Sequence, residues 1–285
     1  MDTAQAQSEA LSAEIEKELA AGHLSFPTFL DVSLKIRRAL ESEDTGLDTL
    51  LPLIQLEPVL AARLIGLANS ALYTSSANPV RDLRQAVLRL GVAAVRSLAL
   101  VVATSQLARA EQLGPARAYA MRLWDHCVDV AAWAYAIAKE TGEVSADEAL
   151  LAGMLHDIGQ FYLLGKAMDY PQLLDHEDEL SDLVLCWHKP VGRAVLQALG
   201  VPEDIVDAVD DREVLGGALP LSGLADVLFL ANLAAEMPNP LTLQREPTRS
   251  ALLEAATHGM DKQAFDALAA AASDERLRAL AALRG

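Results

Sequence analysis

The segment over residues 152–161, AGMLHDIGQF, is largely apolar, yet it carries the adjacent ionisable residues His156 and Asp157 in its middle. Burying a charge without a partner is unfavourable, so such a pair is normally hydrogen-bonded or bound to a metal ion. Three kinds of chemistry are compatible with the pair: a metal site, an acid/base couple, and a hydrogen-bonded pair within the core. The rest of the sequence is needed to decide among these three possibilities.

Three further histidines, His126, His176 and His188, lie in or near the predicted central helices. Neutral imidazoles and carboxylates are ordinary ligands of first-row divalent metals. Adjacent residues on a helix point about 100° apart, so His156 and Asp157 can share an ion only over the seam between them. A histidine from a neighbouring helix would then complete part of the shell. Spacing alone favours the simpler alternative, in which the histidines are hydrogen-bonded core residues.

Helices must position these residues. The composition is 52% hydrophobic and only 5% aromatic, with many alanines and leucines, which favours helices over strands. Apolar residues recur at spacings of three and four, and Gly91, Gly114-Pro115 and Gly200 interrupt the pattern. We therefore predict an all-α fold with helices over 3–21, 28–41, 47–55, from Pro58 onward, 81–90, 92–110, 117–140, 146–163, 176–199 with a kink or break at Pro190, 203–212, and three or four helices after Pro220 that include 274–283.

Composition and charge narrow the class of protein. The formal net charge of −17 disfavours nucleic-acid binding, because phosphate backbones are bound by lysine and arginine. Two cysteines, Cys127 and Cys186, are too few for a disulfide framework. The acidic N-terminus lacks the apolar core of a signal peptide, and the apolar region 215–235 contains Pro220 and Asp226, which favours a core helix over a membrane span. We expect a cytoplasmic, soluble protein with no membrane role.

Several motifs resemble those of the HDOD domain, a bacterial signalling relative of the HD phosphohydrolases. They are LEPVL at 56–60, LANSALY at 67–73, AVLRLG at 86–91, Trp124-Asp125-His126, GMLHDIG at 153–159, and His188 with Val191-Gly192. The resemblance covers roughly residues 20–235 and implies an HD-like helical bundle with a C-terminal helical extension. It divides the chain into an N-terminal helical arm over 1–22, a front half over 23–113, a rear half over 114–238 and the extension over 239–285.

The resemblance also implies a metal site. In HD phosphohydrolases the shell is a histidine, a His-Asp pair and a later aspartate, which correspond here to His126, His156 and Asp157, with Asn232 in place of the aspartate. An amide is a poorer ligand than a carboxylate, the His-His pair of many relatives is missing from AVDDRE at 208–213, and Gln160 stands where lysine is frequent. The implied site is degenerate and has no catalytic residue. It binds a divalent ion such as Fe, Mn, Zn or Ni, or it is satisfied by hydrogen bonds alone.

Three other residues are candidates from the same motifs. His188 belongs to the later His-x-x-Val-Gly element, and Asn69 and Ser70 form the Asn-Ser element of the front half. Asn69 and Ser70 would either contact a ligand or partner or end a helix, because both side chains compete for local backbone hydrogen bonds. The second interpretation is favoured.

The resemblance favours a regulatory protein of bacterial signal transduction that acts through protein–protein or ligand binding without catalysis. Its partners would be signalling proteins in trans, namely a sensor kinase, a response regulator or a cyclic-dinucleotide enzyme. The alternative is a metal-dependent phosphohydrolase that acts on a nucleotide or cyclic dinucleotide through His126, His156 and Asp157. A third hypothesis is a small-ligand sensor whose site lies in the apolar seam between the two halves, near Gly114-Pro115.

Overall fold

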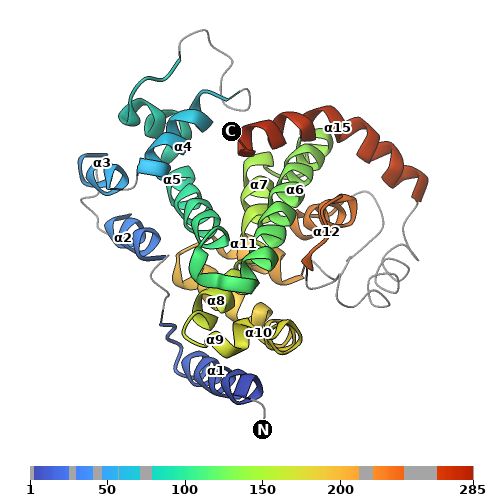
Figure 1. The fold of residues 1–285 in the computed structure, drawn as a ribbon. Helices are drawn as coiled ribbons and strands as arrows, with labels where there is room; N and C mark the ends of the chain where they lie inside the picture. The colour runs from blue at the N-terminus through green and yellow to red at the C-terminus, as the bar shows by residue number, and fades with distance from the viewer. Residues whose placement is uncertain are drawn as a thin grey trace.

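The computed structural model describes residues 3–25, 30–40, 47–56, 58–70, 79–211, 221–240 and 262–284. These residues form helices and connections without a strand, which confirms the predicted all-α class (Figure 1). The predicted contents of 212–220 and 241–261, and the part of LANSALY beyond Ser70, lie outside the described residues.

The front of the molecule is built from short helices around a long one. The elements are α1 (Thr3–Ala20), α2 (Asp31–Leu40), α3 (Leu47–Gln55), α4 (Pro58–Ala68) and α5 (Leu83–Ala108). Gly91 interrupts α5 with φ 82° and ψ 161°, which confirms the predicted separation of 81–90 from 92–110. Residues of α5 belong to two hydrophobic clusters, one with α2–α4 and one with the rear helices, so α5 joins the two halves.

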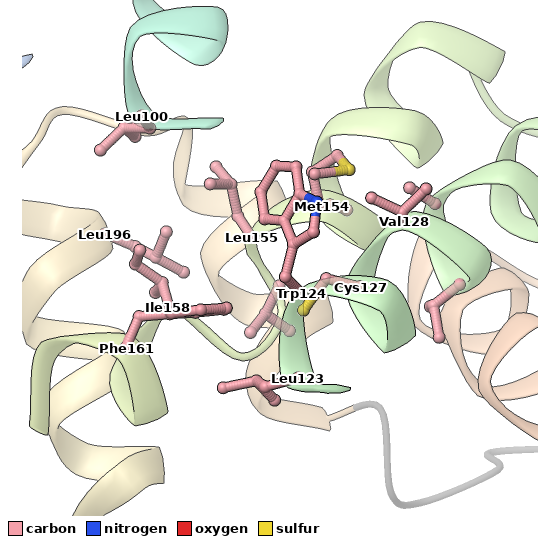
Figure 2. Packing of buried hydrophobic residues seen from close by; sticks show 14 of the residues in the cluster. Leu100, Leu123, Trp124, Cys127, Val128, Met154, Leu155, Ile158, Phe161 and Leu196 are labelled. Carbon is pink, nitrogen blue, oxygen red and sulfur yellow. The ribbon is translucent and has the colours of Figure 1, made fainter. Parts of the chain in front are cut away.

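The rear of the molecule surrounds one central helix. The elements are η2 (Glu111–Ala116), α6 (Arg117–Thr141), α7 (Ala146–Leu155), α8 (Ile158–Ala167), α9 (Pro171–Leu174), α10 (Glu177–Ala198), α11 (Glu203–Asp211), α12 (Leu224–Ala234) and α15 (Lys262–Arg284). Nearly every residue of α6 from Tyr119 to Ala138 is buried, because α7, α12 and α15 pack around it (Figure 1). Figure 2 shows this packing around Trp124, where α6 and α7 meet.

Three predicted elements differ from the structure. The single helix over 146–163 is wrong: α7 ends at Leu155, α8 begins at Ile158, and the turn between them holds His156 and Asp157. The helix predicted over 274–283 is part of the longer α15, which runs through Ser273 without using it as a cap. Of the kink or break predicted at Pro190, the break is wrong, because α10 continues through this residue as one helix, and the kink stays a prediction. In the first case the helical pattern of 146–163 was outweighed by packing against other helices at Gly153 and Gly159.

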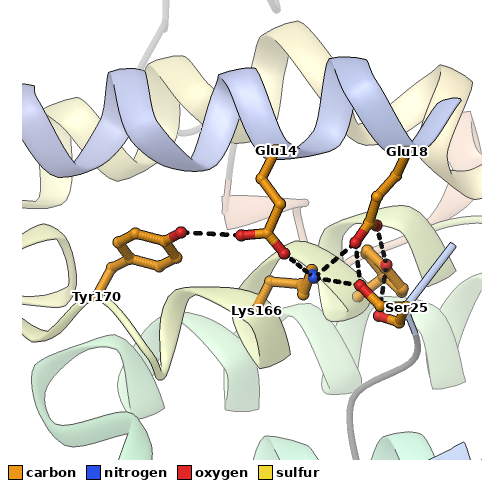
Figure 3. A network of polar contacts seen from close by, with 6 residues as sticks. Glu14, Glu18, Ser25, Lys166 and Tyr170 are labelled. Atoms are coloured by element: carbon orange, nitrogen blue, oxygen red, sulfur yellow. Dashed lines mark hydrogen bonds and ion pairs between the residues drawn. The ribbon is translucent and has the colours of Figure 1, made fainter. Parts of the chain in front are cut away.

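The N-terminal arm is fastened to the body by a polar network (Figure 3). The ammonium group of Lys166 on α8 donates hydrogen bonds to Glu14, to Glu18 at 3.1 Å and to Ser25 at 2.8 Å. The hydroxyl of Tyr170 donates to Glu14 at 2.9 Å. These contacts place α1 against α8–α10 and give Lys166, which is only 8% exposed, a structural partner for its charge.

Among the described residues, no helix combines the length and the apolar character that a membrane span requires.

Candidate metal centre

His126, His156 and Asp157 converge in the interior of the rear half. The two imidazole Nε2 atoms are 3.2 Å apart, and Asp157 Oδ2 lies 3.2 Å from His156 Nε2 and 3.7 Å from His126 Nε2. The three residues are 1%, 4% and 2% exposed. Ligands about 2.0–2.2 Å from an ion and about 90–110° apart are separated by about 2.8–3.6 Å. The two distances of 3.2 Å are therefore those expected between ligands of one ion. The 3.7 Å between His126 Nε2 and Asp157 Oδ2 corresponds to a wider ligand–ion–ligand angle.

The turn between α7 and α8 allows adjacent residues to face the same point. His156 has helical backbone angles, but Asp157 leaves the helix with φ −110° and ψ 21°. On a continuous helix the two side chains would diverge by about 100°. The break turns both toward His126 on α6.

Two glycines on either side of this turn permit the close packing. A Cβ on Gly153 would lie 2.5 Å from Ala131 Cα, and a Cβ on Gly159 would lie 1.9 Å from the carbonyl oxygen of His188. Both distances are too short for any side chain. Gly153 therefore lets α7 approach α6, and Gly159 lets α8 approach α10, which fixes the turn that carries His156 and Asp157.

Backbone carbonyls orient both imidazoles. His156 Nδ1 lies 2.7 Å from the Gly153 carbonyl oxygen, and His126 Nδ1 lies 2.7 Å from the Met237 carbonyl oxygen. A carbonyl only accepts, so each Nδ1 carries a proton and donates it. The two Nε2 lone pairs then face one another and a carboxylate oxygen. This arrangement is repulsive unless a cation, either a metal ion or a shared proton, lies between them.

The ligand set fits a divalent transition metal. Two neutral imidazoles and a carboxylate suit Fe, Mn, Zn and Ni, and Nδ1–H donation to a carbonyl is the usual outer contact of a ligating histidine. Among the described residues, His126, His156 and Asp157 are the group of histidine, cysteine and acidic side chains that meets the geometry of a metal site. The residues present therefore fit the metal that the sequence motifs imply.

A segment that follows α12, residues 235–239, supports the group from outside. Met237 contributes the carbonyl that orients His126, and the amide of Asn239 donates to Asp157 Oδ2 at 2.6 Å. Asp129 on α6 holds this segment by accepting hydrogen bonds from the backbone N–H groups of Glu236 at 2.7 Å and Met237 at 3.0 Å. Sequence reasoning missed all three contacts.

Asn232, the predicted substitute for an aspartate ligand, is half-buried on α12. An amide does meet Asp157, but it belongs to Asn239, seven residues later. The sequence signal for Asn239 is its position between Pro238 and Pro240, which fixes the backbone direction of a short connection.

A small cavity adjoins the candidate metal ligands His156 and Asp157. It has a volume of about 10 Å³ and is lined by His156, Asp157, His188, Lys189, Gly192, Arg193, Val206, Val209 and Asp210. This is space for roughly one water molecule. The structure thus places the predicted residue His188 at the same cavity as His156 and Asp157, and it also brings Asp210 there from α11.

Arg193 at this cavity is surrounded by acidic side chains. Its guanidinium donates to Glu203 at 2.7 Å, to Asp207 at 2.8 Å and to Asp210 at 2.8 Å. A guanidinium held by three carboxylates is not positioned to receive a phosphate unless these contacts are exchanged.

Gln160, at the position where relatives often carry lysine, is 1% exposed and accepts a hydrogen bond from the Tyr119 hydroxyl at 2.7 Å. Burial raises the pKa of Tyr119, so its hydroxyl keeps the proton that this hydrogen bond needs. The Gln160 side chain is therefore part of the packed interior.

Asn69 and Ser70 lie where α4 ends and are not part of the His126, His156 and Asp157 group. Asn69 bonds both backbone groups of Val80, donating to its carbonyl at 2.9 Å and accepting from its N–H at 2.7 Å. The Ser70 hydroxyl donates to the Leu67 carbonyl at 2.8 Å. Ser70 makes the local backbone contact expected of a residue that ends a helix, whereas Asn69 ties the end of α4 to a residue 11 positions later.

Comparisons with known proteins agree with this fold. A candidate metal-dependent phosphohydrolase from Shewanella amazonensis SB2B shares 23% identity, with a TM-score of 0.66 over 98% of this chain and 99% of that one. An HDOD domain protein of unknown function from Geobacter sulfurreducens shares 25% identity, with a TM-score of 0.55 over 95% and 96% of the chains. A protein from Marinobacter aquaeolei VT8, named as a candidate signal transduction protein, shares 18% identity, with a TM-score of 0.51 over 100% of this chain and 67% of that one.

No curated protein matches the chain. The HDOD domain family profile matches residues 26–213, about two thirds of the sequence, and this range contains His126, His156, Asp157 and His188. The chain belongs to the HDOD domain family.

Proposed function

We propose that this chain is a signalling protein of the HDOD family that binds a divalent metal through His126, His156 and Asp157 and acts by binding, without hydrolysis. The observation that carries the proposal is the convergence of two imidazole lone pairs and a carboxylate oxygen at 3.2–3.7 Å in a buried site. A metal ion bound there would link α6 to the turn between α7 and α8 and would stabilise the folded state.

Two features support binding over turnover. Hydrolysis of a phosphate ester requires open coordination at the metal and room for the phosphate. The cavity beside Asp157 has about 10 Å³, and its Arg193 is paired with three carboxylates. A cavity of this size is too small to hold a nucleotide in this conformation.

A metal-dependent phosphohydrolase acting on a nucleotide or a cyclic dinucleotide is the second candidate. The observation in its favour is that Lys189 and Arg193 line the same cavity as His156 and Asp157. Catalysis would require α10 and α11 to separate, so that Arg193 exchanges its carboxylates for phosphate oxygens.

Membership of the HDOD family supports a regulatory role in signal transduction. The proposed partners are signalling proteins in trans: a sensor kinase, a response regulator or a cyclic-dinucleotide enzyme. A formal net charge of −17 makes nucleic acid an unfavourable partner.

The metal content of untagged protein purified without a chelator tests the proposal, with His156→Ala as the site variant and His176→Ala as the control. His176 bonds the Gln172 carbonyl at 2.7 Å and lies outside the metal ligands. We expect roughly one equivalent of Fe, Mn, Zn or Ni in wild type and control, and a loss in His156→Ala, because three ligands form one site. Folded wild type that stays metal-free after incubation with each ion would contradict the proposal. Metal-dependent release of phosphate or of a linear dinucleotide would favour the second candidate.

A further inference from the structure

A larger cavity, of about 300 Å³, lies between the front and rear halves. α4 and α5 form one wall, α6 and α7 form the other, and the last turn of α15 borders it. Small-molecule sites have volumes of about 300–1,000 Å³ and mostly apolar walls. The walls here are mainly apolar and include Leu67, Leu90, Leu98, Val101, Leu151 and Met154.

Apart from Ser105 on α5, the polar groups of this seam cavity come from its rim. Ser145, Asp147 and Glu148 are exposed at the start of α7, and Arg63 reaches across from α4 to donate a hydrogen bond to the Leu283 carbonyl at 3.1 Å. The rim thus carries two carboxylates and one guanidinium in a chain of net charge −17. Both the local and the overall charge disfavour an anionic ligand.

The volume of the seam cavity further limits the kind of ligand that it can hold. An α-helix with its side chains is about 10–12 Å across and rises about 5.4 Å per turn, so a single turn fills roughly 420–610 Å³. The seam cavity is smaller than this and is bordered by α15, so it does not accommodate a helix from a partner. A small molecule is the occupant that the volume allows.

We propose that the seam cavity is a binding site for a neutral, mostly apolar small molecule with a hydrocarbon or aromatic body. The apolar walls would bury that body, and a single polar end would meet Ser145 or Arg63 at the rim. Burial of the apolar surface supplies the binding free energy, and the rim acids exclude fatty-acid-like anions.

The seam cavity borders the helices that carry the histidine ligands. Trp124 precedes His126 by two residues on α6, and Met154 precedes His156 by two residues. Figure 2 shows the Trp124 ring beside Met154. An occupant would touch both helices, so ligand and metal would change one another's affinity by the same factor. This coupling, unlike the cavity itself, rests on the proposed metal-binding function.

The test uses the full chain, stripped of metal, and the neutral fluorescent probe N-phenyl-1-naphthylamine. We expect saturable probe binding that 1-decanol displaces and decanoate displaces at least roughly tenfold less well. Ala94→Phe and Ser105→Phe each place a ring in the seam cavity from α5 and should weaken probe binding at least roughly tenfold. Ala198→Phe is the control, because Ala198 is also half-buried but lies on α10, outside the cavity lining.

Probe binding that does not saturate, or that survives both α5 substitutions in folded protein, would overturn the cavity proposal. Tighter binding of decanoate than of decanol would overturn the neutral class of ligand. The titration is repeated with saturating Mn²⁺, and an unchanged probe affinity would overturn the coupling. Protein that binds the probe but no metal would contradict the proposed function and the coupling while the cavity proposal stands.

Discussion

The two terminal helices are attached to the body in similar ways but with different consequences. α1 is held by Lys166, which bonds Glu14 and Glu18, and α15 is held by Arg276, which bonds Asp129 and Glu236. We refer to these as the α1 contact and the α15 contact. In each contact, one cationic side chain lies between two carboxylates.

The two contacts differ in the additional hydrogen bonds that their carboxylates accept. Asp129 is 1% exposed, accepts hydrogen bonds from Arg276 at 2.7 and 3.1 Å, and also binds the backbone of Glu236 and Met237. Met237 in turn orients His126. In the α1 contact, the side chain of Glu14 is 37% exposed, and its partners are Lys166 and Tyr170. The α15 contact is therefore continuous with the candidate metal ligands, and the α1 contact secures only the N-terminal helix.

Asp129→Asn should have the largest effect. It leaves Arg276 without its buried carboxylate and weakens the hold on the segment after α12. Breaking a buried ion pair from one side costs about 3–5 kcal/mol, and loss of an outer contact costs about 10–100-fold in metal affinity. Urea unfolding and metal titration measure the two effects. Glu236→Gln is the control, because the Glu236 side chain is 70% exposed, and it should cost less than about 1 kcal/mol. Unchanged metal affinity in Asp129→Asn would show that the α15 contact does not support metal binding.

Arg276→Met should destabilise the protein by about 2–3 kcal/mol, less than Asp129→Asn, because Asp129 keeps its two backbone donors. The Arg276 guanidinium also lies 4.8 Å from the centre of the Trp133 ring, and methionine would retain part of that packing. Urea unfolding measures the change. If Arg276→Met costs more than Asp129→Asn, the backbone contacts of Asp129 contribute less than we infer.

Lys166→Met should cost about 1–2 kcal/mol, because its partners are closer to solvent, and it should leave metal affinity unchanged. Limited proteolysis should cleave α1 faster in this variant. A metal affinity that falls as in Asp129→Asn would remove the distinction between the two contacts.

The smallest effect is the pH dependence of the α1 contact. Burial opposes the ionised form of Glu18, but hydrogen bonds from Ser25 and Lys166 outweigh it and lower the pKa of Glu18 below its ordinary 4.5. Burial also opposes the charge of Lys166, but hydrogen bonds to Glu14 and Glu18 raise its pKa above 10.5. Stability from Glu18 is present above pH 4.5 and is lost as pH falls through the lowered pKa. Stability from Lys166 is present below pH 10.5 and is lost as pH rises through the raised pKa.

The stability difference between wild type and Lys166→Met should therefore be constant between about pH 5 and 10 and shrink outside this range. Urea unfolding over pH 3–11 measures it. A difference that varies within the range would show that other groups control the α1 contact.

Local patterns predicted most helices. α3 occupies the predicted residues 47–55, Pro58 begins α4, and Gly91 interrupts α5. Ser145 caps α7 by accepting from the Glu148 N–H at 3.3 Å. Periodicity and capping involve residues within about four positions of one another, so the sequence by itself contains the information that determines them.

For the candidate site, too, the sequence predicted the residue types but not every feature of the backbone that positions them. His126, His156, Asp157 and His188 were candidates from the sequence motifs, and the structure brings them to one region. The turn at His156-Asp157 was missed, because the segment 146–163 has helical periodicity throughout, and the break depends on α7 and α8 packing against different helices at Gly153 and Gly159.

The contacts that orient the candidate metal ligands come from far along the chain. Met237 lies 111 residues after His126, Asn239 lies 82 residues after Asp157, and Arg276 lies 147 residues after Asp129. The sequence by itself determined the helices and the residue types that can bind a metal. Only the tertiary structure decided which carbonyl, amide and guanidinium meet them, because such hydrogen bonds depend on how whole helices pack, and no local pattern records that packing.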